Sequence, residues 1–498
     1  MKEMNVESGP ESRAENLIEN VIKNRGRVYF IGIKGTGTSA LAELLHRAGA
    51  RVSGSDTADV FYTCAILDAL GIPYFEGFDP SRIARERPEL VIHSAAYTPE
   101  KNPEMAEVLR LGVPLAKYTD ALGAYSALFD SSGVAGVHGK STTTAIAGTL
   151  LAAAGLPAQV LAGSAVTSFG GRSTISIGDR YFVAETCEYR KHFLKFHPRR
   201  VLLTSVESDH QDFFPTYESI LGAFVEYGGR IESGGELIYC ADDAGACEAA
   251  SLIGKRRSDI KYTPYGFDAE GYFRIKNYES GDGESRFELA GIPQVWAVRI
   301  PGRHTVRNSA GAIALVKSIA DAEGRAVDIE MTGRLSRALA AFAGCKRRSE
   351  IIGEAGGILF MDDYAHHPTA IRTTLAGLKD FYPRRRLVAS FMPHTYSRTQ
   401  ALLSDFARSF ESADAVFLHK IYASAREAYD GQVTGRLLFE KAAILHSDVR
   451  YVDEPLGALD EAKAVLRAGD LFITLGAGDN WKLGEALFKY YRDGGAAA

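Results

Sequence analysis

Short apolar runs separated by amphipathic segments recur along the whole chain. The first run, Val28–Ile33, is followed by apolar positions at helical spacing from Ala40 to Leu45 and by a second strand-like run that ends at Asp56. The run "ELVIHSAAY" predicts another strand, and a helix is expected from Pro103. Strands that alternate with helices in this way predict a parallel sheet covered by helices.

The alternation of strand and helix restarts twice. A second region begins near Gly133 with "GVAGV", a glycine-lysine turn and a long helix that starts within Thr142–Thr144, and it continues through the apolar runs "RYFVAE", "VLLTSVE" and "ELIYC". A third region opens at "GGILFMDDYAHHP" and continues through "RRLVASFMP", "DAVFLH" and "DLFITLGAGD". We therefore predict an α/β protein of three units, with boundaries near residues 125 and 346.

Composition and charge narrow the class of protein. The chain has 498 residues, of which 46% are hydrophobic and 24% charged, as is typical of a folded protein with several cores. A net charge of −5 gives no general attraction for nucleic acid or for an anionic membrane. The five scattered cysteines lack zinc-ligand spacing, and no apolar run reaches the length of a membrane span or a secretory signal. We expect a cytoplasmic protein with reduced thiols, no nucleic-acid partner and no membrane insertion.

The stretch "GVHGKSTTT", Gly136–Thr144, has the Gly-Lys-Ser end of a phosphate loop, although Val134 stands where the strict motif has its first glycine. Its context of strand, glycine turn and helix points backbone N–H groups and a helix N-terminus at an anion. The loop predicted to hold phosphate consists of Gly136, Val137, His138, Gly139, Lys140, Ser141 and Thr142. Lys140 supplies a mobile cation, and the Ser141 hydroxyl is a candidate Mg²⁺ ligand.

A second glycine-rich turn, "GIKGTG", spans Gly32–Gly37 and departs from G-x-G-x-x-G. Asp56 follows about twenty residues later, where dinucleotide-binding proteins carry an acid for the ribose. From the residues alone, three interpretations stay open: a dinucleotide cofactor, a nucleotide-diphosphate substrate, or a tight turn without ligand. Lys34 adds a cation to the turn or is simply solvated.

Carboxylates and a histidine follow the next two apolar strands. Glu185 and Glu188 come after "RYFVA", and "ESDHQDFF" places Asp209, His210 and Asp212 after the strand that follows. Ligands of parallel α/β sheets lie beyond the carboxyl ends of the strands. These side chains are therefore candidates for holding metal ions against the phosphate loop.

Several motifs, taken together and in order, resemble those of the Mur ligases. They span about Val28 to Leu487 and comprise "FIGIKGTGTSALAELL", "VSGSD", "VIHSAAYTPEKNPE", "GVHGKSTTT", "PGRHTVRNSAGAIAL", "DDYAHHPTAI", "FMPHTYSRT" and "LGAGDN". From the residues alone we expect a polar leader at 1–25, frayed or helical. The resemblance implies a Rossmann-like domain for a UDP-sugar at 26–125, a central P-loop ATPase domain with a mostly parallel sheet at 126–345 and a C-terminal Rossmann-like domain at 346–498. It also implies that the first glycine turn serves a UDP diphosphate and no nicotinamide.

The reaction implied by the resemblance is an ATP- and Mg²⁺-dependent ligation in peptidoglycan precursor synthesis. The lactoyl carboxylate of UDP-N-acetylmuramate would attack the γ-phosphate of ATP, and the amine of L-alanine would then attack the acyl phosphate, with release of ADP and phosphate. The alternative is a sister ligase that attaches a tripeptide to the same UDP-sugar during cell-wall recycling. An oxidoreductase would leave the Lys140 loop without a use, and a non-catalytic nucleotide-binding protein would have no need of the retained motif residues. We expect a monomer or a homodimer.

The resemblance also carries roles onto individual residues. The expected catalytic residues are Lys140, Glu185, His210 and Arg398, and the expected Mg²⁺ ligands are Ser141, Glu185 and His210. Besides the phosphate loop, ATP would be held by His304, Asn308 at the adenine, Arg347 or Arg348 at the γ-phosphate, and Asp363 near the ribose. The UDP-sugar would be held by Gly32, Lys34, Gly35, Thr36, Gly37, Asp56, Ser94 and Glu188. The amino acid would be surrounded by Tyr364, His366, His394 and Arg398, with Arg398 pairing its carboxylate.

The sequence departs from the pattern of the Mur ligases at a few positions. Lys34 stands where glycine is common, and Thr38 stands where methionine is common. Thr305 replaces an asparagine, so we expect adenine to lose one amide partner. The segment "ETCEYR" keeps Glu185 and Glu188 but lacks two carboxylates of the usual motif.

Overall fold

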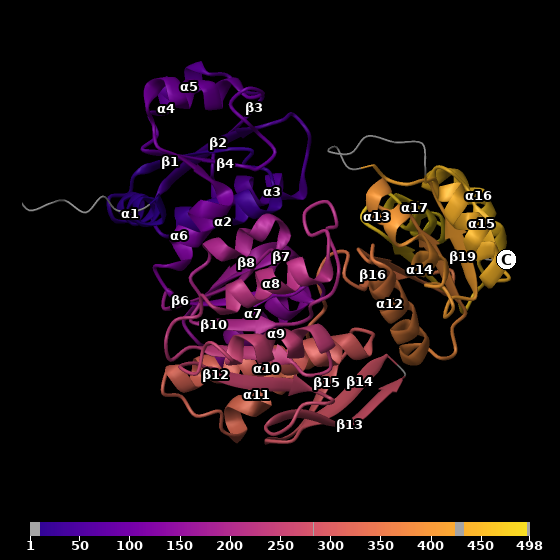
Figure 1. The fold of residues 1–498 in the computed structure, drawn as a ribbon. Coiled ribbons are helices and arrows are strands. Elements are labelled where there is room, and N and C mark those ends of the chain that lie inside the picture. Colours follow the sequence, from indigo (N-terminus) through magenta and orange to yellow (C-terminus); the bar gives the residue numbers. More distant parts are fainter. Residues whose placement is uncertain (1–9, 282, 424–432, 496–498) are drawn as a thin grey trace, which may run out of the picture. The chain divides into compact units, whose positions relative to one another are not determined.

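The structure is a computed structural model, and it describes residues 10–281, 283–423 and 433–495. The chain divides into two compact units. Unit 1 comprises Met1–Val206, Leu221–Thr263 and Ala312–Val327, and unit 2 comprises Glu207–Ile220, Pro264–Gly311 and Asp328–Ala498. Each unit is described by itself below, with the labels of Figure 1.

The first sheet of unit 1 has the strand order β3-β2-β1-β4-β5, and every pairing is parallel. Its strands are β1 (Arg27–Ile31), β2 (Arg51–Asp56), β3 (Tyr74–Glu76), β4 (Leu90–His93) and β5 (Leu115–Lys117). The helices between them are α2 (Thr36–Arg47), α3 (Tyr62–Leu70), α4 (Ser81–Glu86) and α5 (Pro103–Leu111), and α6 (Tyr118–Ser126) follows β5. The predicted parallel sheet is confirmed, with α2 beginning directly after the glycine turn.

The second sheet in unit 1 runs β11-β10-β6-β9-β7-β8. Its strands are β6 (Asp130–Ala135), β7 (Ala158–Val166), β8 (Arg172–Ser176), β9 (Tyr181–Glu185), β10 (Arg200–Leu203) and β11 (Glu236–Cys240), and β8 alone of these pairs antiparallel, with β7. Helix α7 (Lys140–Ala154) follows β6, and α9 (Ala244–Gly254) follows β11. Short 3-10 turns occupy Thr167–Phe169 and Tyr189–Lys195. The helix predicted to start within Thr142–Thr144 thus begins at Lys140.

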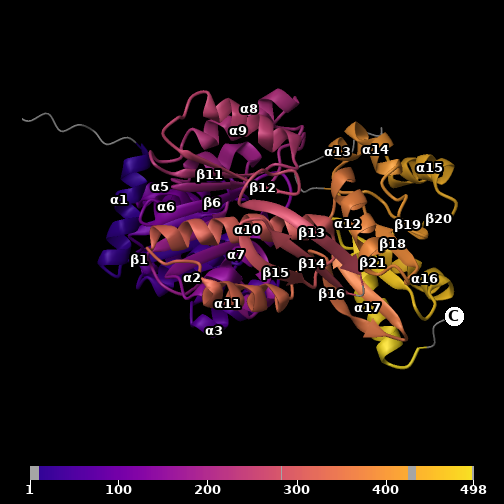
Figure 2. The same cartoon turned by 90° about the horizontal axis from the view of Figure 1, so that it is seen from below.

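Helix α1 (Pro10–Lys23) packs beside α6 (Figure 2). Ile18 and Val21 on α1 are buried, and the Glu15 carboxylate lies 3.3 Å from Nε2 of His197. The predicted polar leader is therefore helical from residue 10, and residues 1–9 lie outside the described part. Three elements have residues in both units: α8 (Tyr217–Gly228), β12 (Lys261–Gly266) and α10 (Arg303–Ala322).

Unit 2 contains an antiparallel meander that the prediction of a mostly parallel sheet missed. Strands β13 (Phe273–Gly281), β14 (Glu284–Leu289) and β15 (Ile292–Val298) pair in sequence, and β13 pairs parallel with the end of β12. The strands alternate apolar with polar positions, as in "FRIKNYES", which is the pattern of a sheet with one solvated face. Helix α11 (Ile329–Ala340) packs on β15.

The remaining sheet of unit 2 has the order β16-β17-β21-β18-β19-β20 and is parallel except for β16. Its strands are β16 (Glu350–Ala355), β17 (Ile358–Asp363), β18 (Leu387–Phe391), β19 (Ala415–Leu418), β20 (Val449–Tyr451) and β21 (Leu471–Leu475). Its helices are α12 (Pro368–Phe381), α13 (Tyr396–Ala401), α14 (Leu403–Ala407), α15 (Gly435–Leu445), α16 (Leu459–Val465) and α17 (Trp481–Arg492), with a 3-10 turn at Pro455–Ala458. Buried side chains of β17, β18, β19 and β21 form apolar cores on both faces of this sheet. In the parts of the chain that the structure describes, no helix is both long enough and apolar enough to cross a bilayer.

Candidate active site

The phosphate loop leaves strand β6, which pairs with β9 on one side and β10 on the other. Gly136 has φ 139° and Gly139 has φ 81°, and a Cβ on Gly136 would lie 2.1 Å from Oγ1 of Thr204, so both positions require glycine. Ser205 holds the loop, because its carbonyl accepts from Val137 N at 3.1 Å and its hydroxyl accepts from His138 N at 2.9 Å. Val134 lies inside β6, so the missing first glycine of the strict motif falls within the strand and not within the turn.

Lys140, the first residue of α7, is folded back onto its own loop. Its ammonium donates to Oε2 of Glu188 at 2.9 Å, to the carbonyl of Val137 at 3.2 Å and to the carbonyl of Gly136. Burial disfavours the charged ammonium, but Glu188, together with Glu185 and Cys187, outweighs burial and raises the pKa of Lys140 above its ordinary value. Glu188 was expected at the UDP-sugar, and the structure places its carboxylate on the phosphate-loop lysine instead.

Glu185 ends strand β9 directly opposite Val134 of β6, and Oε2 of Glu185 accepts from Gly163 N at 2.7 Å. Ser141 is buried at the second position of α7. A hydroxyl oxygen and a carboxylate oxygen at this edge of the sheet are the donor types that suit Mg²⁺. The chemistry of the two unit 1 residues predicted as metal ligands therefore fits that ion. His210, the third, belongs to unit 2.

The first glycine turn is shaped by Asp56 at the end of β2. Its carboxylate accepts from Lys34 N at 2.7 Å, from Thr57 N at 2.8 Å and from the Tyr97 hydroxyl at 3.1 Å, and the residue is 5% exposed. Gly32 has φ 86° in the same turn. The position that serves a ribose in dinucleotide-binding proteins is here directed into the protein, where it fixes the turn.

The Lys34 side chain is buried, so the interpretation that it is solvated is wrong. Its ammonium donates to the carbonyls of Thr57 at 2.8 Å and Asp59 at 3.0 Å, and it lies 5.3 Å from the centre of the Tyr74 ring. The lysine that replaces the common glycine thus ties the turn to the segment that follows β2. Thr38, which replaces methionine, donates to the carbonyl of Gly32 at 2.6 Å and closes the same turn.

A cavity of about 390 Å³ in unit 1 connects the first glycine turn with the end of β9. The turn contributes Gly35, Thr36 and Gly37, and Glu185 lines the same cavity. The remaining lining residues are Thr38, Ser94, Ala95, Tyr118, Thr119, Leu122, Gly123, Thr186, Cys187, His192, Phe193 and Phe196. Of the residues predicted for the UDP-sugar, Gly35, Thr36, Gly37 and Ser94 are brought together here, whereas Gly32, Lys34, Asp56 and Glu188 lie outside the lining. Sequence reasoning missed Tyr118 and His192, which fall in no glycine-rich or acidic motif.

In unit 2 the four residues predicted for the amino acid form one cluster. The Arg398 Nη1 lies 3.4 Å from Nδ1 of His394, the rings of His366 and His394 are 6.2 Å apart, and the Tyr364 and His366 rings are 5.2 Å apart. Burial and then the Arg398 charge hold the pKa of His366 well below its ordinary value, so this ring is neutral.

Asp209 joins this cluster through Arg398. Its Oδ1 accepts from Nη2 at 3.0 Å and from Nε at 3.3 Å, and both side chains are buried. Burial disfavours the carboxylate, but the charge of Arg398, together with the neighbouring histidines and the hydrogen bond from His210 N, outweighs burial and keeps the pKa of Asp209 far below its ordinary value. His210, the next residue, is half-buried and has φ 53°.

The Arg347 side chain forms hydrogen bonds with other residues of unit 2. Its Nε donates to Oδ2 of Asp362 at 2.8 Å, and its Nη2 donates to the carbonyls of Gly476 at 2.7 Å and Gly478 at 3.3 Å. This network argues against Arg347 as the γ-phosphate ligand. Both arginines lie over the Tyr364 ring, Arg347 at 5.2 Å and Arg348 at 5.1 Å, and Arg348 stays the alternative candidate.

Asp363 is also turned inward. It is 7% exposed, and its carboxylate accepts from Ser349 N at 2.6 Å and from Ala365 N at 2.8 Å. Burial raises its pKa. These bonds order the segment after β17, which is a different role from the expected contact with the ATP ribose.

His304 and Asn308 lie four residues apart at the start of α10, and so share one face of that helix. Thr305, between them, is buried and donates to the carbonyl of Pro301 at 2.9 Å. The threonine hydroxyl is therefore used by the helix itself, and the loss of an amide partner for adenine stays a prediction.

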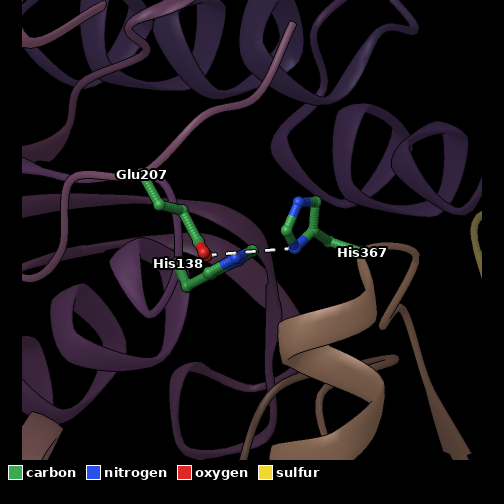
Figure 3. Close-up of side chains that lie close together, drawn as sticks. All are labelled: His138, Glu207 and His367. Atoms are coloured by element: carbon green, nitrogen blue, oxygen red, sulfur yellow. Dashed lines mark ion pairs between the residues drawn. The ribbon is translucent and has the colours of Figure 1, made fainter. Parts of the chain in front are cut away.

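Glu207 and His367 form a further pair within unit 2 that sequence reasoning missed (Figure 3). The Glu207 Oε1 lies 3.9 Å from Nδ1 of His367, and Oε2 of Glu207 accepts from the Thr369 hydroxyl at 3.1 Å. His367 precedes α12 and accepts from Thr369 N at 3.3 Å. His367 is thus the N-cap residue of α12, while His366 belongs to the Arg398 cluster. The signal that could have found Glu207 is its place in "ESDH", beside Asp209.

Comparison with known families identifies the protein family to which these motifs belong. Residues 27–130 match the Mur ligase family, catalytic domain; residues 134–316 match the Mur ligase middle domain; and residues 347–478 match the Mur ligase, glutamate ligase domain. The chain belongs to the Mur ligase family. The family expected from the sequence motifs is thereby confirmed, together with its three-part α/β architecture.

Individual Mur ligases resemble this one along nearly its whole length. A UDP-N-acetylmuramate--L-alanine ligase of Treponema pallidum (strain Nichols) is 51% identical over 467 residues, which cover 94% of this chain and 97% of the relative. That of Borreliella afzelii (strain PKo) is 35% identical over 463 residues, with coverage of 92% and 98%. Among solved structures, UDP-N-acetylmuramate-alanine ligase from Thermotoga maritima shares the fold with a TM-score of 0.73 at 24% identity, covering 94% of this chain and 99% of that one. A murein peptide ligase from Psychrobacter arcticus shares the fold with a TM-score of 0.63 at 23% identity and coverage of 94% and 99%.

Proposed function

We propose that this Mur ligase joins L-alanine to the lactoyl carboxylate of UDP-N-acetylmuramate, with ATP as the source of energy, in the synthesis of peptidoglycan precursors. Relatives that carry this activity in their names match it over more than nine tenths of both chains. The observation that carries the proposal is the cavity of about 390 Å³, which joins the first glycine turn to Glu185, beside the phosphate-loop strand. A UDP-sugar held at the turn would reach the edge of the sheet where the phosphate loop would hold ATP.

Each residue of the proposed site would have a role that follows from its chemistry. The backbone of Gly35, Thr36 and Gly37 at the start of α2 suits a diphosphate, and the loop at Gly136–Gly139 suits the ATP phosphates. Lys140 would leave Glu188 for the phosphates and balance their charge as the sugar carboxylate approaches. Arg398 would bind the carboxylate of L-alanine and orient its amine toward the acyl phosphate.

The proposed reaction requires Mg²⁺. Ser141 and Glu185 would hold it in unit 1, and His210 is the expected third protein ligand. When bound, it supplies positive charge that stabilises the phosphoryl group during transfer. A cytoplasmic location, the state of monomer or homodimer, and the domain boundaries at residues 26, 126 and 346 stay predictions.

The test is ADP release by the purified chain with ATP, Mg²⁺ and UDP-N-acetylmuramate, to which L-alanine or the tripeptide is added in turn. We expect turnover with L-alanine and none with the tripeptide alone, and none with L-alanine after chelation of the metal. Glycine and L-serine serve as competitors, since one methyl group in a pocket gives about 10–200-fold discrimination. Turnover with the tripeptide only would assign the chain to the recycling ligases instead.

A further inference from the structure

Asp209 and Arg398 form a buried ion pair that joins two segments 189 residues apart in the sequence. Asp209 follows β10 and belongs to the Glu207–Ile220 segment of unit 2, and Arg398 lies in α13. The side chains are 5% and 8% exposed. A buried guanidinium without a counter-charge is strongly disfavoured, so the pair fixes both charges in the interior of unit 2.

Asp209 binds Arg398 side-on, that is, along the edge of the guanidinium that carries Nε and Nη2. One carboxylate oxygen, Oδ1 of Asp209, takes both Nε at 3.3 Å and Nη2 at 3.0 Å of Arg398. Arginine carries five N–H donors in a planar fork, and a carboxylate ligand takes two parallel donors from one edge of it. With Asp209 on the Nε edge, Nη1 lies 3.4 Å from Nδ1 of His394 and 3.5 Å from the His394 carbonyl oxygen. A substrate carboxylate at the end-on edge formed by Nη1 and Nη2 would replace these two long contacts.

The Asp209 carboxylate and the Arg398 backbone are themselves held in place. Oδ1 of Asp209 accepts from His210 N at 2.7 Å, and Oγ1 of Thr395 accepts from Arg398 N at 3.4 Å. His210 has φ 53° and Thr395 has φ 67°. A positive φ is uncommon for residues other than glycine, and it is most costly for a β-branched residue such as threonine. Strained residues of this kind persist where the surrounding structure holds them, and they gather at functional sites.

We propose that Asp209 is a positioning residue for the amino-acid substrate: it holds the Arg398 guanidinium side-on, so that the end-on edge is ready for the substrate carboxylate. The inference rests on the proposed function, since it assigns the partner of Arg398 in that reaction. Asp209 does not touch the reacting atoms, and its effect reaches the substrate only through Arg398. Its loss therefore affects binding of the amino acid and leaves binding of the other two substrates unchanged.

The experiment is steady-state kinetics of Asp209→Asn with each of the three substrates varied. Asn keeps the size and one acceptor oxygen but loses the charge, and a charge-assisted hydrogen bond is about twice as strong as a neutral one. We expect the KM for L-alanine to rise about tenfold or more, with kcat and the KM values for ATP and UDP-N-acetylmuramate changed by less than about threefold. The matched control is Asp470→Asn, because the buried Asp470 pairs with the partly exposed Arg386 in unit 2, at 2.7 Å and 3.1 Å. That variant is expected to lower the melting temperature without changing the KM for L-alanine.

Coupling of the two residues separates positioning from a general structural role. In an Arg398→Ala background, Asp209→Asn should raise the KM for L-alanine no further, because its partner is gone. Asp209→Glu restores the charge, and it should recover part of the affinity for L-alanine; it also serves as the second variant if Asp209→Asn folds poorly. Equal changes in all three KM values, an unchanged KM for L-alanine, or independent effects in the double variant would overturn the inference. A wild-type chain that releases no ADP with L-alanine would instead overturn the proposed function.

Discussion

The ammonium of Lys140 lies 2.9 Å from Oε2 of Glu188, three residues beyond the carboxylate that ends strand β9. Both side chains are largely buried, at 12% and 3% exposure. The pair keeps a cation at the mouth of the phosphate loop. Under the proposed function, Lys140 would exchange the Glu188 carboxylate for the phosphates of ATP.

Replacing Lys140 by alanine removes the cation and is expected to lower ADP release by about a hundredfold or more. The affinity for UDP-N-acetylmuramate should change by less than about threefold, because the residues that line its proposed cavity do not include Lys140. Calorimetric titration with the UDP-sugar checks the second expectation. A folded variant that lost both ADP release and binding of UDP-N-acetylmuramate would contradict the separation of the two ligands.

Glu188→Gln tests whether Glu188 acts through Lys140 or through the UDP-sugar. Because its carboxylate contacts Lys140, we expect a change in the KM for ATP, with the KM for UDP-N-acetylmuramate unchanged within about threefold. Turnover should fall less than in Lys140→Ala, since the lysine is kept. A selective effect on the UDP-sugar would restore the role that the sequence motif predicts for Glu188.

Gly37→Ala tests the cavity beside the first glycine turn. An added Cβ would lie 2.8 Å from Cζ and Oη of Tyr118, which lines the same cavity, so the ring must move. We expect the KM for UDP-N-acetylmuramate to rise about tenfold while the KM for ATP is kept. Gly222→Ala is the control, because a Cβ at Gly222 of α8 meets nothing within 4 Å and alanine favours a helix by about 1 kcal/mol. An unchanged KM for the UDP-sugar in Gly37→Ala would argue against this cavity as its site.

Arg347 and Arg348 are neighbours with different surroundings, and alanine substitutions should separate them. Arg347→Ala leaves the buried Asp362 without its charged partner, so the free energy of unfolding should fall by about 2–3 kcal/mol. Arg348→Ala should keep the thermal stability and lower kcat/KM for ATP by about tenfold or more. Thermal unfolding and ADP release measured on both variants check this. A stable, inactive Arg347→Ala would reinstate Arg347 as the phosphate ligand.

The sequence predicted the elements and motifs that depend on local pattern. The strand before Gly136, the start of helix α5 at Pro103 and the cluster around Arg398 follow from apolar runs, helix-start residues and motif order. It could not predict which way a motif side chain turns. Asp363, Arg347 and Asp56 were assigned to ligands, but each forms hydrogen bonds with partners that the tertiary fold supplies, such as Ser349 N for Asp363. The β13–β15 meander was missed because its alternating strands lie inside a region otherwise dominated by α/β alternation.

His419 is a buried neutral histidine between two strands of the unit 2 sheet. Its Nδ1 contacts the carbonyl of Val452 at 2.7 Å and therefore donates, so its Nε2 accepts from the Ser390 hydroxyl at 2.9 Å. Burial lowers the pKa of His419 to about 4. A proton on Nε2 would cost the Ser390 bond and place a charge in the core.

The free energy of unfolding should therefore fall as the pH is lowered from about 6.5 to about 4. In that window the unfolded ring binds a proton and the folded ring does not, so stability rises with pH; the contribution of His419 to stability is lower by about 2 kcal/mol at pH 5 than at pH 7. Denaturant unfolding between pH 4.5 and 7.5 of the wild type and of His419→Gln checks this, because the difference between the two curves isolates this residue from other histidines. His419→Gln should be less stable at pH 7 and lose less stability on acidification. Parallel curves, or an imidazole signal of His419 that titrates near pH 6.5 in the folded protein, would show that the ring charges freely in the native state.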